Sequence, residues 1–143
     1  MFTSLQSLIE LAESRQLPLH EIILQGEIAS SGRSREALRA DMTPRLETMR
    51  ASVDKGLAGP VHTLSGLSNG NAHKFYTSIQ QNDSALTGPC LSRAIARAMA
   101  VGEVNAGMGC IVATPTAGAA GVLPAVLLSL QEGRGFTDEQ LVN

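Results

Sequence analysis

Aromatic residues are nearly absent from this chain. Its 143 residues include one Tyr, three Phe and no Trp. A hydrophobic core must therefore be built from Ala, Leu, Ile, Val and Met, and helices that meet through small residues suit this composition better than a β-sandwich does. We expect an all-α fold, with residues 1–143 forming one domain.

Further absences exclude whole classes of function. No apolar run is long enough to cross a membrane, and the N-terminus lacks the basic and apolar regions of a secretory signal. The net charge of −2 and the pI near 5.9 give no sign of a nucleic-acid or membrane-surface partner. The two cysteines, Cys90 and Cys110, form no CxxC motif and suit a reducing cytoplasm better than a disulfide scaffold.

Apolar residues recur at helical spacing over most of the chain. The predicted helices are one capped by Thr3 or Ser4, one opened by Pro18, one running from a Ser34 cap to a stop at Gly56, Ala72–Ile79, Cys90–Ala106, and one after Gly121. Thr43-Pro44 interrupts the third, where we expect a kink or a restart. The last is almost entirely apolar, so we expect it to be buried on nearly every side.

The stretch from Glu103 to Leu130 carries the strongest functional signal. Within it, Thr114–Gly121 is predicted to be a tight loop that leads into a helix. Backbone amides and hydroxyls at a helix start can hold a carboxylate or a phosphate. The alternative is that the hydroxyls of Thr114 and Thr116 only cap the helix. Spacing leaves both open, because neither a dinucleotide glycine fingerprint nor a phosphate-binding Lys is present.

A second glycine-rich loop covers residues 57–71 and contains the hydroxyl residues Thr63, Ser65 and Ser68. His62 lies beside it and is the one histidine that we consider a candidate functional residue. Glu103 and Asn105 lie just ahead of the central loop on a nonpolar helix. Polar groups held there need partners, so they either brace the loop or contact a ligand.

Cys110 has two interpretations. It lies in an apolar segment, so it is either an inert buried thiol or a thiolate ligand of a metal centre.

The C-terminal sequence predicts the beginning of a helix. Thr137-Asp138-Glu139-Gln140 has the spacing of a capping box, and only Leu141, Val142 and Asn143 follow it. An isolated helix of so few residues is not stable in water. We therefore expect a helical domain that is incomplete at its C-terminus.

The sequence EVNAGMG, followed by IVATPTAGAAGVLPAVL, resembles the α-chain of the iron–sulfur-dependent L-serine dehydratases (L-serine ammonia-lyases). The agreement continues upstream through Ser65-Gly66-Leu67, the turn Leu86-Thr87-Gly88-Pro89 and the N-terminal Leu-Ile-Glu-Leu helix. It covers essentially the whole chain. The resemblance implies the N-terminal half of such an α-chain, which is a partial helical catalytic domain with glycine-rich loops.

The resemblance also implies a chemistry. A cytoplasmic enzyme of this family holds a [4Fe–4S] cluster, in which one iron binds the substrate hydroxyl as a Lewis acid, and L-serine becomes pyruvate and ammonia. The implied partners are L-serine, a β-chain and the C-terminal portion of the α-chain, in an oligomer. Loops 63–71 and 114–121 would hold the substrate through Ser65, Gly66, Thr114, Thr116, Ala117 and Gly118.

The chain departs from the family pattern at its cysteines. Ala120 stands where single-chain relatives carry a cysteine in the TPTAG-like loop, and Cys110 lies two positions before the cysteine of the two-chain type. Leu67-Ser68-Asn69-Gly70-Asn71 replaces Leu-Thr-Gly-Gly-Asp or -Glu. A cubane cluster needs three or four thiolates, so with Cys110 as its one candidate ligand this chain needs further protein to act. The alternative is a catalytically inactive helical fragment or interaction module.

Overall fold

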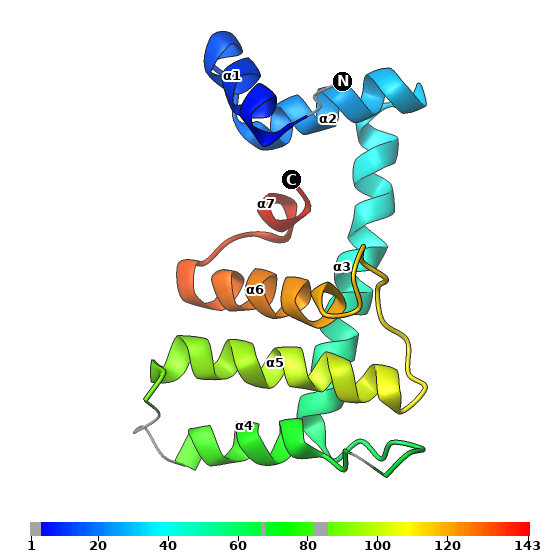
Figure 1. The fold of residues 1–143 in the computed structure, drawn as a ribbon, viewed down its shortest axis with the longest axis vertical. Helices are drawn as coiled ribbons and strands as arrows, with labels where there is room; N and C mark the ends of the chain where they lie inside the picture. The colour runs from blue at the N-terminus through cyan, green and yellow to red at the C-terminus, as the bar shows by residue number, and fades with distance from the viewer. Residues whose placement is uncertain (1–3, 67, 82–85) are drawn as a thin grey trace. The chain divides into compact units, whose positions relative to one another are not determined.

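A computed structural model describes residues 4–66, 68–81 and 86–143 (Figure 1). The helices are α1 (Leu5–Arg15), α2 (Leu19–Ser31), α3 (Arg35–Ala58), α4 (Asn71–Gln81), α5 (Gly88–Ala106), α6 (Ala119–Arg134) and α7 (Asp138–Val142). Among the described residues there is no β-strand, only an isolated bridge between His62 and Asn69. The predicted all-α fold is therefore confirmed. None of these helices is long and apolar enough to cross a membrane.

The chain divides into two compact units. One consists of Met1–Thr43 with Val142–Asn143, and the other of Pro44–Leu141. The second contains both glycine-rich loops, so the candidate site belongs to it. That residues 1–143 form one domain stays a prediction.

In the first unit, hydroxyl caps fix two helix starts, as the sequence predicts. The hydroxyl of Ser4 accepts the amide hydrogen of Ser7 at 3.1 Å, which opens α1. The hydroxyl of Ser34 accepts the amide hydrogen of Ala37 at 3.2 Å, which opens α3. These caps satisfy amides that have no partner inside the helix.

Helix α3 corrects one expectation and narrows another. It passes Gly56 to end at Ala58, and it continues through Pro44, so of the kink or restart expected there the restart does not occur. Gly56 is buried, and a Cβ built there would lie 2.6 Å from the Cβ of Ala100 in α5. The glycine is therefore not a helix stop; it allows two helix backbones to approach closely.

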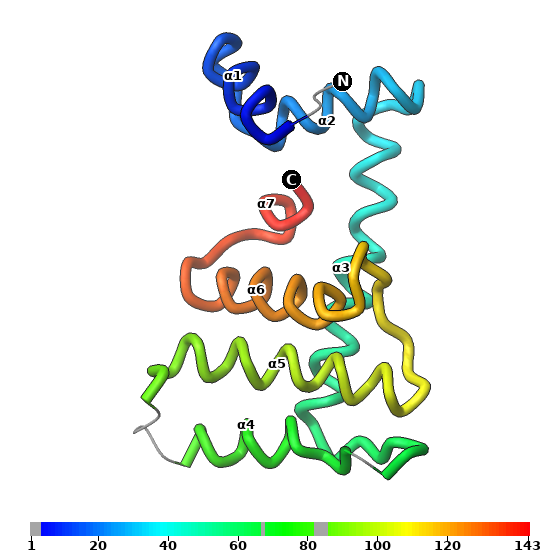
Figure 2. Tube along the Cα trace, in the orientation of Figure 1, coloured from blue at the N-terminus to red at the C-terminus, as the bar shows by residue number. Residues whose placement is uncertain are grey.

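The second unit is organised around α5. Figure 1 shows α4, α5 and α6 side by side, with the C-terminal part of α3 crossing them, and α5 packs against both α4 and α6. Val53 of α3, Val101 of α5 and Leu128 of α6 form a buried apolar cluster where three helices meet. Figure 2 follows the chain from the end of α5 (yellow) through a long connection into α6 (orange).

Helix α6 is less buried than its composition predicts. Val122, Val126 and Leu130 are exposed, so the expectation of burial on nearly every side is wrong. The interior side of α6 uses mainly small residues together with Pro124 and Leu128, which face α5 and α3. Gly135 ends the helix in the left-handed region at φ 70°.

The predicted C-terminal capping box is also present. The backbone amide of Gln140 donates to the hydroxyl of Thr137 at 3.2 Å, and the backbone amide of Thr137 donates to the side-chain oxygen of Gln140 at 2.9 Å. It opens α7.

Candidate functional site

A buried carboxylate anchors the first glycine-rich loop. Glu103 of α5 is 5 % exposed, and its carboxylate accepts the amide hydrogens of Asn71 at 2.8 Å and Ala72 at 3.3 Å. It also accepts a hydrogen bond from the hydroxyl of Ser68. Because these amides begin α4, Glu103 caps that helix from a different helix. Of the two sequence interpretations, Glu103 therefore braces a loop, but that loop is 63–71 rather than the one that follows it.

The loop itself is a folded turn. The hydroxyl of the buried Thr63 donates to the carbonyl of Ser68 at 2.8 Å, and the amide of Gly66 donates to the carbonyl of Thr63 at 3.0 Å. Gly66 has φ 68°, a region that few other residues adopt. Ser65 and Gly66 lie exposed in this turn, and their role in substrate binding stays a prediction.

The second loop begins by packing against the first. A Cβ at Gly107 would lie 2.8 Å from the Cγ1 of Val61 and 3.2 Å from the carbonyl oxygen of His62. Only a glycine permits this approach, so the bases of the two loops meet at residues 61–62 and 107. His62, the candidate histidine, is exposed at this junction.

A lysine that sequence reasoning missed lies beside the same loop. A Cβ at Gly109 would lie 3.5 Å from the Nζ of Lys55, which is in the last turn of α3. Within the described part of the chain, no hydrogen bond or ion pair engages this ammonium group. A Lys near the C-terminus of a helix commonly complements the helix dipole, so its sequence position alone gave no functional signal.

The backbone amides at the start of the second loop donate hydrogen bonds, and those further along do not. Those of Gly107, Met108 and Gly109 donate to the last carbonyls of α5, at 2.7 to 3.1 Å. From Cys110 to Gly118, no amide donates a hydrogen bond to any residue that the structure describes. Thr116, Ala117 and Gly118 are exposed, and their free amides lie immediately before the start of α6.

The two threonines hold this loop in shape. The hydroxyl of Thr114 donates to the carbonyl of Thr116 at 2.8 Å, and the hydroxyl of Thr116 accepts the amide hydrogen of Ala119 at 3.2 Å. Thr116 therefore caps α6, as one sequence interpretation holds. Its hydroxyl hydrogen is still available for an acceptor. Together with the free amides of 116–118, this arrangement can bind one anionic group.

The structure separates the two cysteines. Both thiols are exposed, so the interpretation of Cys110 as a buried thiol is wrong. Cys90 lies at the start of α5 and Cys110 beyond its end, and a helix of 19 residues is about 27 Å long. No group of three His, Cys, Asp or Glu side chains among the described residues could hold a metal ion. These residues therefore do not fit a complete cubane cluster, which needs three or four ligands.

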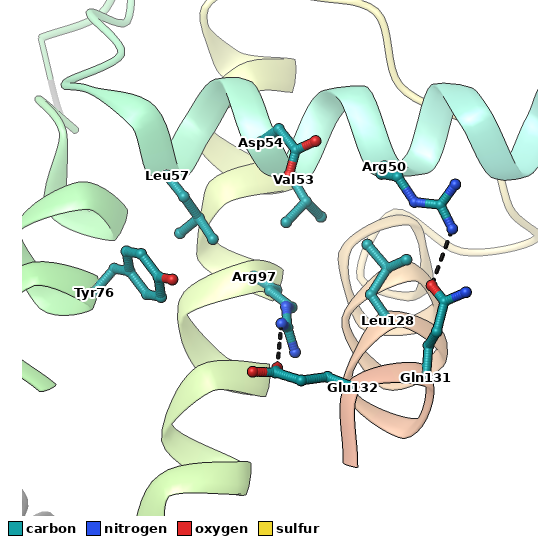
Figure 3. A pocket seen from close by; sticks show the side chains of 9 residues that line it. All are labelled: Arg50, Val53, Asp54, Leu57, Tyr76, Arg97, Leu128, Gln131 and Glu132. Atoms are coloured by element: carbon teal, nitrogen blue, oxygen red, sulfur yellow. Dashed lines mark hydrogen bonds and ion pairs between the residues drawn. The ribbon is translucent and has the colours of Figure 1, made fainter. Parts of the chain in front are cut away.

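A pocket of about 300 Å³ lies elsewhere in the second unit, between α3, α4, α5 and α6 (Figure 3). Its arginines are already engaged: Arg50 donates to Gln131 at 2.9 Å, and Arg97 donates to the hydroxyl of Ser129 at 2.6 Å and pairs with Glu132. These contacts tie α6 to α3 and α5. None of the predicted site residues lines this pocket, so we assign it a structural role.

Comparison with known proteins identifies the family. The family model described as "Serine dehydratase alpha chain" matches residues 14–143. The chain belongs to this family. It is 37% identical over 142 residues to the "Probable L-serine dehydratase, alpha chain" of Bacillus subtilis. It is also 31% identical over 143 residues to the "L-serine dehydratase, alpha chain" of Peptoniphilus asaccharolyticus.

The family relatives are longer proteins. The matched region covers 99% of this chain and 47% of the Bacillus protein, and 100% of this chain and 49% of the Peptoniphilus protein. The chain thus spans about half the length of these serine dehydratase alpha chains. No solved structure matches it.

Proposed function

We propose that this chain is part of an L-serine ammonia-lyase, which converts L-serine to pyruvate and ammonia, and that further protein completes the active site. The observation that carries the proposal is the loop Thr114–Gly118, exposed from Pro115 onward, whose free amides immediately precede α6 inside a segment that matches the serine dehydratase alpha chain family. The relatives' names specify L-serine as their substrate and describe one chain of a multichain enzyme.

In this proposal the loop holds the carboxylate of serine. The amides of Thr116, Ala117 and Gly118 and the hydroxyl of Thr116 provide hydrogen-bond donors for one anion. Lys55 provides a positive charge near Gly109, where the second loop begins. Ser65 and Gly66, exposed on the other loop, are proposed as further substrate contacts. Loss of the α-proton and of the hydroxyl as water leaves aminoacrylate, and water then converts this to pyruvate and ammonia.

The cofactor and the partners are proposals as well. A [4Fe–4S] cluster would supply Lewis-acid chemistry at the serine hydroxyl, but the described residues do not supply its ligand set, so no step is assigned to it. We propose that a β-chain and the C-terminal portion of an α-chain supply the cluster ligands, in a cytoplasmic oligomer. Cys110 is the candidate ligand that this chain offers, and the iron analysis below tests whether it is one.

The incomplete ligand set favours one alternative, a catalytically inactive helical fragment or interaction module. Co-expression with the half of the Bacillus alpha chain that this chain does not match, together with a β-chain, distinguishes the two. After anaerobic purification, a brown complex that forms pyruvate from L-serine supports the lyase. A colourless complex without pyruvate formation supports the alternative.

In such a complex, Thr116→Val is expected to raise KM for L-serine about tenfold, because one hydrogen bond to the carboxylate is worth about 1.5 kcal/mol. Thr116→Ser is the matched control, since it keeps the hydroxyl that caps α6. Steady-state pyruvate assays measure the effect, and an unchanged KM in Thr116→Val contradicts the carboxylate site.

Cys110→Ser is expected to leave the iron content of the complex unchanged, because no second ligand lies beside Cys110 among the described residues. Cys90→Ser is the control at the other exposed thiol. Iron and sulfide analysis after anaerobic purification provides the measurement. A loss of iron in Cys110→Ser alone would instead identify Cys110 as a cluster ligand.

A further inference from the structure

Helices α5 and α6 each expose an apolar stripe. Leu91, Ile95 and Met99 follow one another at intervals of four along α5, and Val122, Val126 and Leu130 do so along α6, with exposed fractions between 36% and 55%. Residues four apart lie on the same side of a helix. Because α5 and α6 pack together, the two stripes lie on neighbouring helices. We call these six residues the α5–α6 face.

The residues among the α5 side chains are small and uncharged, and on α6 the exposed Leu123 adds to the apolar surface. On α5 the exposed side also includes Gly102 and Ala106, and a Cβ at Gly102 would meet nothing within 4 Å. The nearby arginines are turned elsewhere, because Arg93 and Arg97 pair with Glu132. A face of this kind suits another helix with an apolar side, which can approach closely over small residues. A membrane surface would call for several basic residues at the border, whereas the described ends of the two stripes have one, Arg134, a turn beyond Leu130.

We propose that the α5–α6 face docks an amphipathic helix of the polypeptide that corresponds to the other half of the family's α-chains. The inference rests on the part of the proposed function that invokes further protein. The matched region takes only 47% and 49% of the two relatives' lengths, so in them as much sequence again accompanies this fold. Two halves of one polypeptide meet at high effective concentration, and an apolar face of this extent is then covered.

The test uses this chain and the half of the Bacillus alpha chain that it does not match. Light scattering should show a 1:1 complex. Ile95→Glu and Val126→Glu should each weaken binding at least about a hundredfold, because a carboxylate would be buried unpaired. Ala51→Glu is the matched control, since Ala51 is an exposed residue of the same unit outside the face. Circular dichroism should show unchanged helix content in all three variants.

A second measurement needs no variant of the face. Hydrogen peroxide should oxidise the exposed Met99 in the free chain, and the complex should protect it. Met42, exposed in the first unit, is the internal reference.

Three results would overturn the inference: no complex, undiminished binding by both Glu variants, or a homodimer of this chain that the same variants abolish. A protected, 1:1 complex that forms no pyruvate with a β-chain present would leave the docking intact and contradict the proposed lyase. If the complex forms pyruvate and still assembles with both Glu variants, the proposed lyase is supported and the docking inference is contradicted.

Discussion

Glu103→Ala is expected to lower the free energy of unfolding by about 3 kcal/mol, the scale for removing one partner of a buried charged hydrogen-bond set. The substitution leaves the amides of Asn71 and Ala72 and the hydroxyl of Ser68 without their acceptor. Helix α4 then loses its cap, and loop 63–71 loses its anchor. Urea denaturation followed by circular dichroism at 222 nm measures the change.

Two further variants test whether the loss of stability in Glu103→Ala comes from the missing carboxylate. Glu103→Gln keeps the volume but turns an NH₂ group toward the donors, so we expect a loss of similar size. Glu47→Ala removes a carboxylate from an exposed position of α3 and should change stability by less than about 0.5 kcal/mol. If Glu103→Gln is as stable as the unmodified chain, the carboxylate is not what holds the loop.

Gly56→Ala is expected to destabilise the chain by about 2 kcal/mol. Alanine favours a helix over glycine by about 1 kcal/mol, but here its methyl group would lie 2.6 Å from the Cβ and 2.7 Å from the carbonyl oxygen of Ala100. Both helices must shift to admit it. The same urea titration gives the free-energy difference.

Gly102→Ala is the control of opposite sign. It lies inside α5 with nothing within 4 Å of its added methyl group, so it should stabilise the chain by about 0.5 to 1 kcal/mol. If both alanine variants stabilise, α3 and α5 are not in close contact at Gly56.

Local sequence signals predicted the helices well because caps and apolar spacing act within a few residues. Ser4, Ser34 and Thr137 each cap the helix that they were expected to cap. Gly56 was interpreted wrongly because these local signals do not include contacts with residues distant in sequence. A glycine that ends a helix and one that admits a neighbouring helix differ only in what packs against them, and Ala100 is distant in sequence.

The candidate site was predicted less completely. The loop at Thr114–Gly118 stood out because it joins hydroxyls and small residues at a helix start. The loop that Glu103 braces and the proximity of Lys55 to Gly109 depend on how α3, α4 and α5 pack. The exposure of α6 was missed because composition reports how apolar a helix is, and not whether this chain supplies enough neighbours to cover it.

The placement of the two thiols provides a built-in probe. Cys90 and Cys110 are both open to solvent; Cys90 lies in the first turn of α5 and Cys110 beyond its other end. An alkylating reagent therefore reaches each without any engineered residue, and mass spectrometry of the two peptides follows both rates in one sample. Ligand or partner binding at the second loop should slow the alkylation of Cys110, and the alkylation rate of Cys90 is the internal reference.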